Sequence, residues 1–337
     1  METLSAQENI KTPDQKPTVK KWLGVFYIIL SAFFFALMNV FVRLAGDLPT
    51  FQKAFFRNAV AAFIAFIMLV KSKDFSVKKG CRIPLLIRSI AGTVGIVANF
   101  YAVDNMGLAD ASILNKLSPF FAVIFSVIII KEKANGWDWA LIALAFFGAL
   151  FVVKPAFNMS VVPALVGVLG GLGAGIAYAF VRLLGNRGER KSVVVFYFSL
   201  FSCLVVTPAF IVGFVPMAWW QVLFLLLAGA CAGAAQFSIT TAYACAPAKE
   251  ISVYDYFQVV FTAILGWTCF QEIPDWLSFI GYFIIISAAV LKYLKTKYWT
   301  KSKTDTPPLP DSSGAQGSPS EGCDDATPEQ STEVKEE

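Results

Sequence analysis

Two charged side chains lie inside long apolar blocks of the sequence, and they are the first candidates for chemistry. Lys116 lies in the block Leu108–Ile130, and Asp255 lies in the block Pro247–Phe270. An ionisable group inside hydrocarbon is costly, so it is a functional candidate by default. A buried lysine could bind an anionic group of a solute, and a buried carboxylate could respond to protons or to an amine. The alternative is a structural pair in which each charge compensates the other.

Several other kinds of chemistry are poorly supported by the composition. The sequence contains no histidine, which excludes histidine-based metal sites, serine–histidine triads and histidine proton relays. Its six cysteines show no metal-ligand spacing such as CxxC. The net charge of +5 does not indicate nucleic-acid binding, because the basic residues lie next to apolar segments. We therefore expect no metal, no cofactor and no nucleic-acid partner.

The elements that must position Lys116 and Asp255 are membrane-spanning helices. Apolar residues make up 57% of the 337 residues and the mean hydropathy is +0.63, with the charges confined to short gaps between apolar blocks. Crossing about 30 Å of hydrocarbon takes about 20 helical residues. The runs are continuously apolar rather than alternating, which excludes barrel strands. The sequence therefore predicts an all-α integral membrane protein with ten transmembrane helices, at approximately Trp22–Val42, Phe51–Val70, Pro84–Val103, Leu108–Ile130, Trp137–Val153, Val162–Leu183, Val193–Gly213, Met217–Thr241, Pro247–Phe270 and Trp276–Leu294.

Basic residues are distributed unequally between the loops, and this asymmetry predicts the orientation. The loops on the side of the N-terminus hold most of the lysines and arginines, whereas the opposite loops hold little beyond Arg43, Lys53 and Lys154. We therefore expect a multi-pass protein of the cell membrane with both termini in the cytoplasm. Residues 1–21 are expected to form a cytoplasmic segment, and residues 297–337 a disordered acidic cytoplasmic tail.

The two halves of the sequence, residues 22–155 and 156–296, resemble each other. Span one ends in FVRLAG at Phe41–Gly46, and span six ends in FVRLLG at Phe180–Gly185. Lys116 and Asp255 occupy matching positions in spans four and nine. Because each half has an odd number of spans, the second five-helix repeat must be inverted relative to the first. Inverted repeats of this kind build transporters in which a central site alternates between the two faces.

The chain resembles the drug/metabolite transporter superfamily, of the ten-span type with two EamA domains. The segments that carry the resemblance are FFRN at Phe55–Asn58, MGLADASILNKLSPFFAVIFSVIIIKEK at Met106–Lys133 and APAKEISVYDYFQVVFTAILGWTCFQE at Ala246–Glu272. The resemblance covers about residues 22–294 and implies a transporter in which residues of spans four and nine face a central cavity. Position 258 is glutamine where a proline like Pro119 is expected, so the sequence does not decide whether the helix of span nine is interrupted.

We expect a secondary transporter that moves a small organic metabolite, such as an organic anion or an amino acid, by alternating access. One alternative is an intramembrane lipid-modifying enzyme, but beyond Lys116 and Asp255 the spans hold no cluster of catalytic groups at one depth. The other alternative is a membrane scaffold that does not transport. The residues expected to bind the solute or to couple its transport are Lys116, Asp255, Asn115, Tyr254, Asn99, Gln236, Arg57 and Gln258.

Other polar and small residues in the spans have structural roles as their first interpretation. Arg43 and Arg182, at the ends of spans one and six, are expected to reach the membrane interface, and Arg88 is expected to anchor the inner leaflet. Single amide and hydroxyl side chains could form interhelical hydrogen bonds instead of binding solute. Glycines from Gly167 to Gly175 form two overlapping GxxxG steps, which let helices approach closely within one protomer or in a homodimer.

Overall fold

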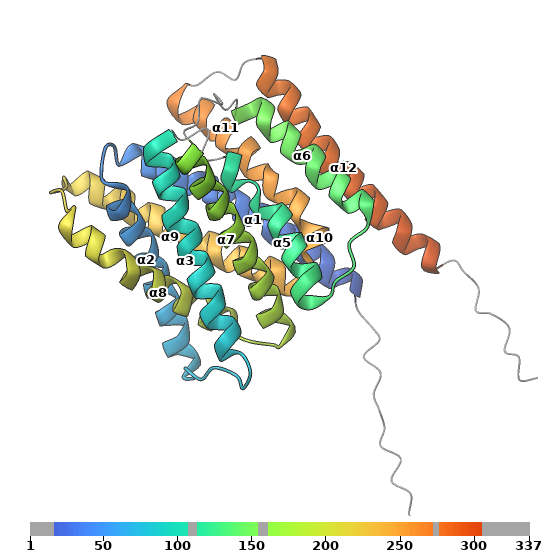
Figure 1. Cartoon of the computed structure of the whole chain (residues 1–337), viewed down its shortest axis with the longest axis horizontal. Helices are drawn as coiled ribbons and strands as arrows, with labels where there is room; N and C mark the ends of the chain where they lie inside the picture. The colour runs from blue at the N-terminus through green and yellow to red at the C-terminus, as the bar shows by residue number, and fades with distance from the viewer. Residues whose placement is uncertain (1–16, 107–112, 154–160, 272–275, 305–337) are drawn as a thin grey trace, which may run out of the picture. The chain divides into compact units, whose positions relative to one another are not determined.

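The regular structure of this protein is entirely helical over the described part of the chain. The computed structural model describes residues 17–106, 113–153, 161–271 and 276–304, and it has no strand in these ranges. Most of the expected N-terminal segment and acidic tail lie outside them. Figure 1 shows the elements, which in chain order are α1 (Pro17–Leu44), α2 (Thr50–Ser72), α3 (Arg82–Met106), α5 (Ser118–Phe125), η1 (Ser126–Ile130), α6 (Gly136–Val153), α7 (Val161–Asn186), α8 (Lys191–Val212), α9 (Trp219–Cys245), α10 (Ala248–Ile251), η2 (Ser252–Tyr256), α11 (Phe257–Phe270) and α12 (Trp276–Thr304).

These helices correspond to the ten expected spans. Within the described residues, seven helical stretches are long and apolar enough to cross a membrane. Of the other three spans, the third corresponds to α3, the fifth corresponds to the shorter helix α6, and the ninth is divided among α10, η2 and α11. The ten-helix, all-α expectation is confirmed.

The two halves of the chain exchange helix partners in matching ways. The first helix of the first half, α1, packs along α9, and its counterpart α7 packs along α3. Likewise α1 contacts α11 while α7 contacts α5, and α2 packs against α8 (Figure 1). A two-fold relation between the halves requires each contact to recur with the halves interchanged. The repeat in the sequence is therefore also a repeat in the packing.

Glycines bring the interlocked helices into close contact. A Cβ atom at Gly173 of α7 would lie 2.7 Å from the Ala91 carbonyl oxygen of α3. One at Gly171 would lie 2.7 Å from the Leu114 carbonyl oxygen, and one at Gly175 would lie 2.3 Å from the Phe121 Cβ. Only the absence of a side chain permits these approaches. The GxxxG face of span six thus packs inside one protomer, and it leaves no glycine seam there for a homodimer.

Spans four and nine are both interrupted near their middle. In span four, a turn at Lys116 and Leu117 precedes α5, and Pro119 stands in the first turn of that helix without an N–H to continue the ladder. In span nine, the backbone tightens into the 3₁₀-helix η2 at Ser252–Tyr256. This second interruption occurs without a proline, so Gln258 does not preserve a continuous α-helix. Lys116 and Asp255 lie in these two interruptions.

Candidate functional site

Lys116 and Asp255 meet between the two interrupted spans. The Lys116 Nζ atom lies 3.1 Å from the Asp255 Oδ2 atom, and it donates a hydrogen bond of 2.7 Å to the Gln258 Oε1 atom. The side chains of the two charged residues are only 12% and 8% exposed. The Tyr256 hydroxyl donates to the Lys116 carbonyl oxygen at 2.8 Å and so joins the backbones of the two breaks. The inverted repeat thus places the matching charges in direct contact.

A second polar group surrounds Arg88, which the sequence interpretation placed at the membrane surface. That interpretation is wrong, because Arg88 is 1% exposed and lies in the core. Its Nη2 atom is 3.4 Å from the Gln236 Oε1 atom, and its guanidinium lies 3.9 Å from the centre of the Phe198 ring. A Cβ atom at Gly92 would lie 2.3 Å from the Arg88 Nη1 atom, so this glycine leaves the space that the guanidinium fills.

Arg57 and Tyr178 interact electrostatically with residues of these two polar groups. The Arg57 guanidinium lies 5.8 Å from the centre of the Phe35 ring. Tyr178 stacks on Tyr243 with ring centroids 5.1 Å apart. The Tyr178 hydroxyl interacts electrostatically with Arg57, with Arg88 and with the Asp255 carboxylate. Side chains from both halves therefore share one polar region inside the bundle, which we call the central polar region: Arg57, Arg88, Lys116, Tyr178, Gln236, Tyr243, Asp255 and Gln258.

Three of the residues expected at the site lie at its margin or outside it. Asn115 is half-buried next to Lys116. Tyr254 is buried, and its hydroxyl interacts electrostatically with Glu250 and Tyr293. Asn99 lies where α3 crosses α7, with its backbone nitrogen 3.2 Å from the Cβ position of a glycine on α7. The repeat equivalence of Asn99 and Gln236 therefore reflects a matching place in the helix rather than a matching contact.

Two further buried ion pairs tie the spans together. Arg182 pairs with Glu132 at 2.9 Å and also donates to the Tyr243 carbonyl oxygen, so the expectation that Arg182 reaches the membrane interface is wrong. Lys292 of α12 pairs with Asp138 of α6 at 2.8 Å, and their side chains are 3% and 7% exposed. Each of these buried cations has a carboxylate partner. Neither Arg57 nor Arg88 has one among the described residues.

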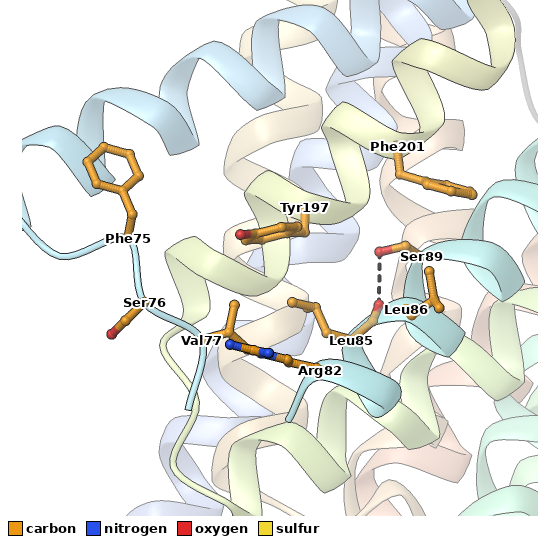
Figure 2. Close-up of a pocket in the computed structure, with 9 residues that line it drawn as sticks. All are labelled: Phe75, Ser76, Val77, Arg82, Leu85, Leu86, Ser89, Tyr197 and Phe201. Carbon is orange, nitrogen blue, oxygen red and sulfur yellow. Dashed lines mark hydrogen bonds between the residues drawn. The ribbon is translucent and has the colours of Figure 1, made fainter. Parts of the chain in front are cut away.

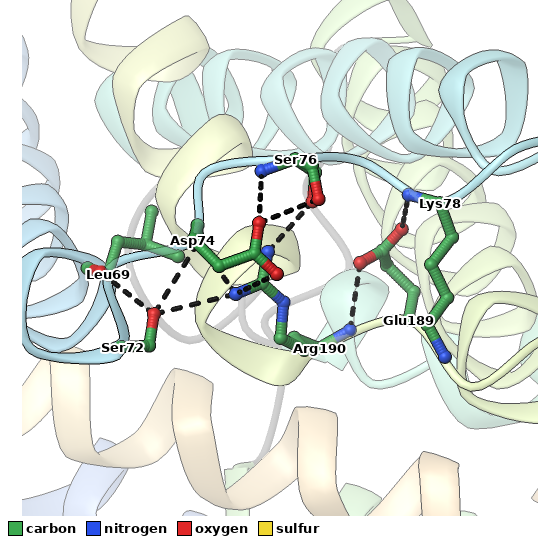
Figure 3. A network of polar contacts seen from close by, with 7 residues as sticks. All are labelled: Leu69, Ser72, Asp74, Ser76, Lys78, Glu189 and Arg190. Carbon is green, nitrogen blue, oxygen red and sulfur yellow. Dashed lines mark hydrogen bonds and ion pairs between the residues drawn. The ribbon is translucent and has the colours of Figure 1, made fainter.

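At one end of the bundle, the loop between α2 and α3 is held by the connection between α7 and α8 (Figure 3). The Glu189 carboxylate accepts hydrogen bonds of 2.9 Å from the backbone N–H groups of Lys78 and Arg190. The Arg190 side chain donates to the carbonyl oxygens of Asp74 and Ser76 at 2.6 and 2.8 Å. We call the bond between Glu189 and Lys78 the Glu189 latch, because it joins the second half of the chain to the first.

An equivalent contact joins the halves at the other end of α2. The Gln52 side chain accepts a hydrogen bond from the Val215 N–H at 3.1 Å and donates one to the Val215 carbonyl oxygen at 2.9 Å. Gln52 and Glu189 are 137 residues apart in the sequence, and so are their backbone partners Lys78 and Val215. We call this contact the Gln52 latch. The two latches thus occupy matching positions of the repeat, although the Gln52 side chain is a neutral amide and the Glu189 side chain is a charged carboxylate.

A cavity of about 480 Å³ lies beside the Glu189 latch, between the loop after α2, the start of α3 and α8 (Figure 2). Its walls are mainly apolar, and the Ser89 hydroxyl there donates to the Leu85 carbonyl oxygen at 2.9 Å. None of the residues expected to bind solute lines this cavity, whose walls include Phe75, Arg82 and Tyr197. The candidate site is therefore the central polar region rather than this surface cavity.

Comparison with known proteins gives a family match and two similar relatives. Residues 22–154 and 163–294 each match the model of the EamA-like transporter family. The pseudopaline exporter CntI of Pseudomonas aeruginosa is 33% identical over 270 residues, which cover 79% of this chain and 94% of the exporter. Human solute carrier family 35 member G1 is 27% identical over 298 residues, covering 83% of this chain and 81% of that protein. A solved crystal structure with 17% identity has a TM-score of 0.70 and covers 84% of this chain and 99% of its own, so it shares the fold.

Proposed function

The chain belongs to the EamA-like transporter family, and from this premise we propose that Lys116 and Asp255 act in moving a small organic metabolite by alternating access. It is a multi-pass membrane transporter of small molecules rather than an enzyme. The single observation that supports the proposal is the buried Lys116–Asp255 pair, with 3.1 Å between Nζ and Oδ2, at matching positions of two interrupted spans. The similar exporter moves pseudopaline, and we propose an organic metabolite as the solute here.

The pair is suited to a step that depends on the relative movement of the halves. Lys116 belongs to the first half and Asp255 to the second, so their ion pair stabilises the arrangement in which spans four and nine are in contact. A solute anion that binds Lys116, or a proton that neutralises Asp255, removes that stabilisation. Because both groups are shielded from bulk water, replacing the ion pair with a solute anion on Lys116 or a proton on Asp255 changes the relative energy of the two access states.

The test compares single and double neutral variants of this pair. Removing one partner of a buried ion pair costs about 3–5 kcal/mol, because the other charge is left without compensation, whereas removing both is often neutral. We therefore expect Lys116→Met and Asp255→Asn each to lower the melting temperature. The double variant is expected to fold like the wild type but to show no solute counterflow in proteoliposomes.

The Lys292–Asp138 pair provides the control, because it is as deeply buried and has the same ion-pair chemistry, with Glu250 as a second carboxylate 3.4 Å from the Lys292 Nζ atom. Its double variant, Asp138→Asn with Lys292→Met, is expected to retain transport, with a lower melting temperature because Glu250 loses its contact with Lys292. Normal flux in the Lys116→Met/Asp255→Asn variant would show that the central pair is structural, while leaving the transporter assignment intact.

We also propose that both termini face the cytoplasm and that the protein lies in the cell membrane. The support is the excess of lysine and arginine in the loops on the N-terminal side, which is the usual mark of cytoplasmic loops. In this orientation the Glu189 latch lies at the cytoplasmic end of the bundle and the Gln52 latch at the outer end.

A further inference from the structure

We propose that Arg57 and Arg88 form a binding site for an organic dianion, in which one carboxylate or phosphate group of the solute is bound by Arg88. The inference rests on the transport function proposed above and specifies the chemical class of its solute. It follows from the hydrogen-bonding capacity of Arg88, from the packing around it and from the charge of the central polar region.

Arg88 has donors that the protein leaves unused. A guanidinium carries five N–H donors and no acceptor. In the described structure the Arg88 side chain makes one hydrogen bond, to Gln236, and its Nε atom is buried without a partner. A buried charge without a counter-charge is strongly unfavourable, so such groups are retained where a ligand compensates them. A planar carboxylate or a phosphate matches the fork of N–H groups that remains.

The packing around Arg88 holds its guanidinium in one place. The face of the group lies against the Phe198 ring, and Gly92, one turn along α3, provides the space beside Nη1. One turn after Gln236 on α9, the buried Thr240 hydroxyl also has no hydrogen-bond partner within the described ranges. A cation held against an aromatic ring on one face can bind a ligand only through its edge. The N–H groups along the edge of the Arg88 guanidinium are therefore already oriented to donate two hydrogen bonds to one anionic group.

Arg57 adds a second positive charge to the same region. Arg57 and Arg88 repel each other electrostatically, and both interact electrostatically with Tyr178. The Lys116–Asp255 pair is neutral as a unit, so the two arginines leave the central polar region with an excess charge of +2. A solute with two negative groups neutralises both. A cation or an uncharged solute leaves the repulsion in place.

Arg182 shows how the same fold compensates an arginine that has a structural role. Its Nε atom pairs with Glu132 at 2.9 Å, and its Nη1 atom donates to two backbone carbonyl oxygens at 3.2 and 3.3 Å. Arg182 and Arg88 are both shielded from water, yet only Arg182 has a carboxylate partner among the described residues. This contrast provides the matched control for the experiment.

The first measurement is the melting temperature of purified variants without ligand. Arg88→Met together with Gln236→Leu removes the charge and the amide that would lose its donor. We expect this variant to be at least as stable as the wild type, because an uncompensated charge has been replaced by an apolar side chain of similar length. Arg182→Met is expected to lower the melting temperature by several degrees, because it leaves Glu132 buried without its partner.

The second measurement is stabilisation by succinate, malate, glycerol 3-phosphate and inorganic phosphate, with uncharged succinamide as the matched control. We expect at least one of these dianions to raise the melting temperature of the wild type. Comparing the rise with the two dicarboxylates and the rise with the two phosphates shows which anionic group is preferred. Loss of either arginine is expected to weaken that binding roughly 10- to 100-fold, as expected for a charge-assisted hydrogen bond. Succinamide is expected to have no effect.

Three results would overturn the dianion site. They are a failure of all four dianions to stabilise the wild type, undiminished binding in either the Arg57→Met or the Arg88→Met variant, and destabilisation of the ligand-free Arg88→Met/Gln236→Leu variant as large as that of Arg182→Met. Failure of the transport function is distinguishable from these. Arginine-dependent dianion binding without flux in proteoliposomes would support the dianion site and refute transport. Flux that does not depend on either arginine would support transport and refute the dianion site.

Discussion

Removing the Glu189 side chain is expected to shift the transporter toward the state open at the Glu189 end, and removing Gln52 to shift it the opposite way. Glu189 is 6% exposed, and its bond to the Lys78 N–H joins the halves at 2.9 Å. Such a charge-assisted bond is worth about 1.5–3 kcal/mol. Glu189→Ala should therefore change the ratio of the two access states about 10- to 100-fold. Gln52 makes two neutral bonds to Val215, worth about 1 kcal/mol each, so Gln52→Ala should change it about thirtyfold.

The assay measures distances between spin labels by double electron–electron resonance in liposomes. One label pair, at Lys79 and Asn186, reports on the Glu189 end, and another, at Asp47 and Phe214, reports on the Gln52 end; all four positions are exposed. Glu189→Ala should populate longer distances for the first pair, and Gln52→Ala for the second. The exposed Lys191→Ala change is the control.

The opposite sign of the two shifts is the critical feature. The double variant Gln52→Ala/Glu189→Ala should return close to the wild-type balance, because the two losses partly cancel. Shifts in the same direction, or longer distances at both ends in each single variant, would refute the idea that the latches close opposite ends. They would instead indicate a general loosening of the bundle.

Three further outcomes are expected. Gly173→Ala should destabilise the protein by about 1–3 kcal/mol in thermal unfolding, since its Cβ would lie 2.7 Å from a backbone oxygen of α3, while Gly136→Ala, with open space around it, should not. Hydrogen bonds from the Ser76 side chain and backbone hold the pKa of the Asp74 carboxyl below its usual value of 3.8. That contact is therefore complete above about pH 4 and is lost as the pH falls through the lowered pKa, so hydrogen exchange at Ser76 should show an acid-dependent rise that Asp74→Asn abolishes. In cells, Ser76→Cys should react only with membrane-permeant reagents and Asp47→Cys also with impermeant ones; the reverse pattern would refute the proposed orientation.

Much of the architecture could be predicted from the sequence because it depends on one-dimensional properties. The length of an apolar run determines whether a helix can cross a bilayer, and repeated segments such as FVRLAG and FVRLLG reveal two related halves. The same repeat placed Lys116 and Asp255 at matching positions, and their 3.1 Å contact follows from the two-fold relation of the halves. The tightening of span nine at Ser252–Tyr256 was not predictable from a proline, because none is present there.

The tertiary structure alone decided which charges are compensated. By sequence, Arg88 and Arg182 both lie near an end of their expected spans, four residues after Pro84 and one before Leu183, and both were expected at the membrane surface. The rotation of α7 directs Arg182 to Glu132, whereas the rotation of α3 and the space left by Gly92 direct Arg88 into the core. A carboxylate partner 50 residues away in the chain is not visible in a local pattern. The sequence therefore determined that this protein is a ten-helix transporter, and the packing of the helices decided which of its buried charges are paired, because burial and pairing are properties of neighbours in space.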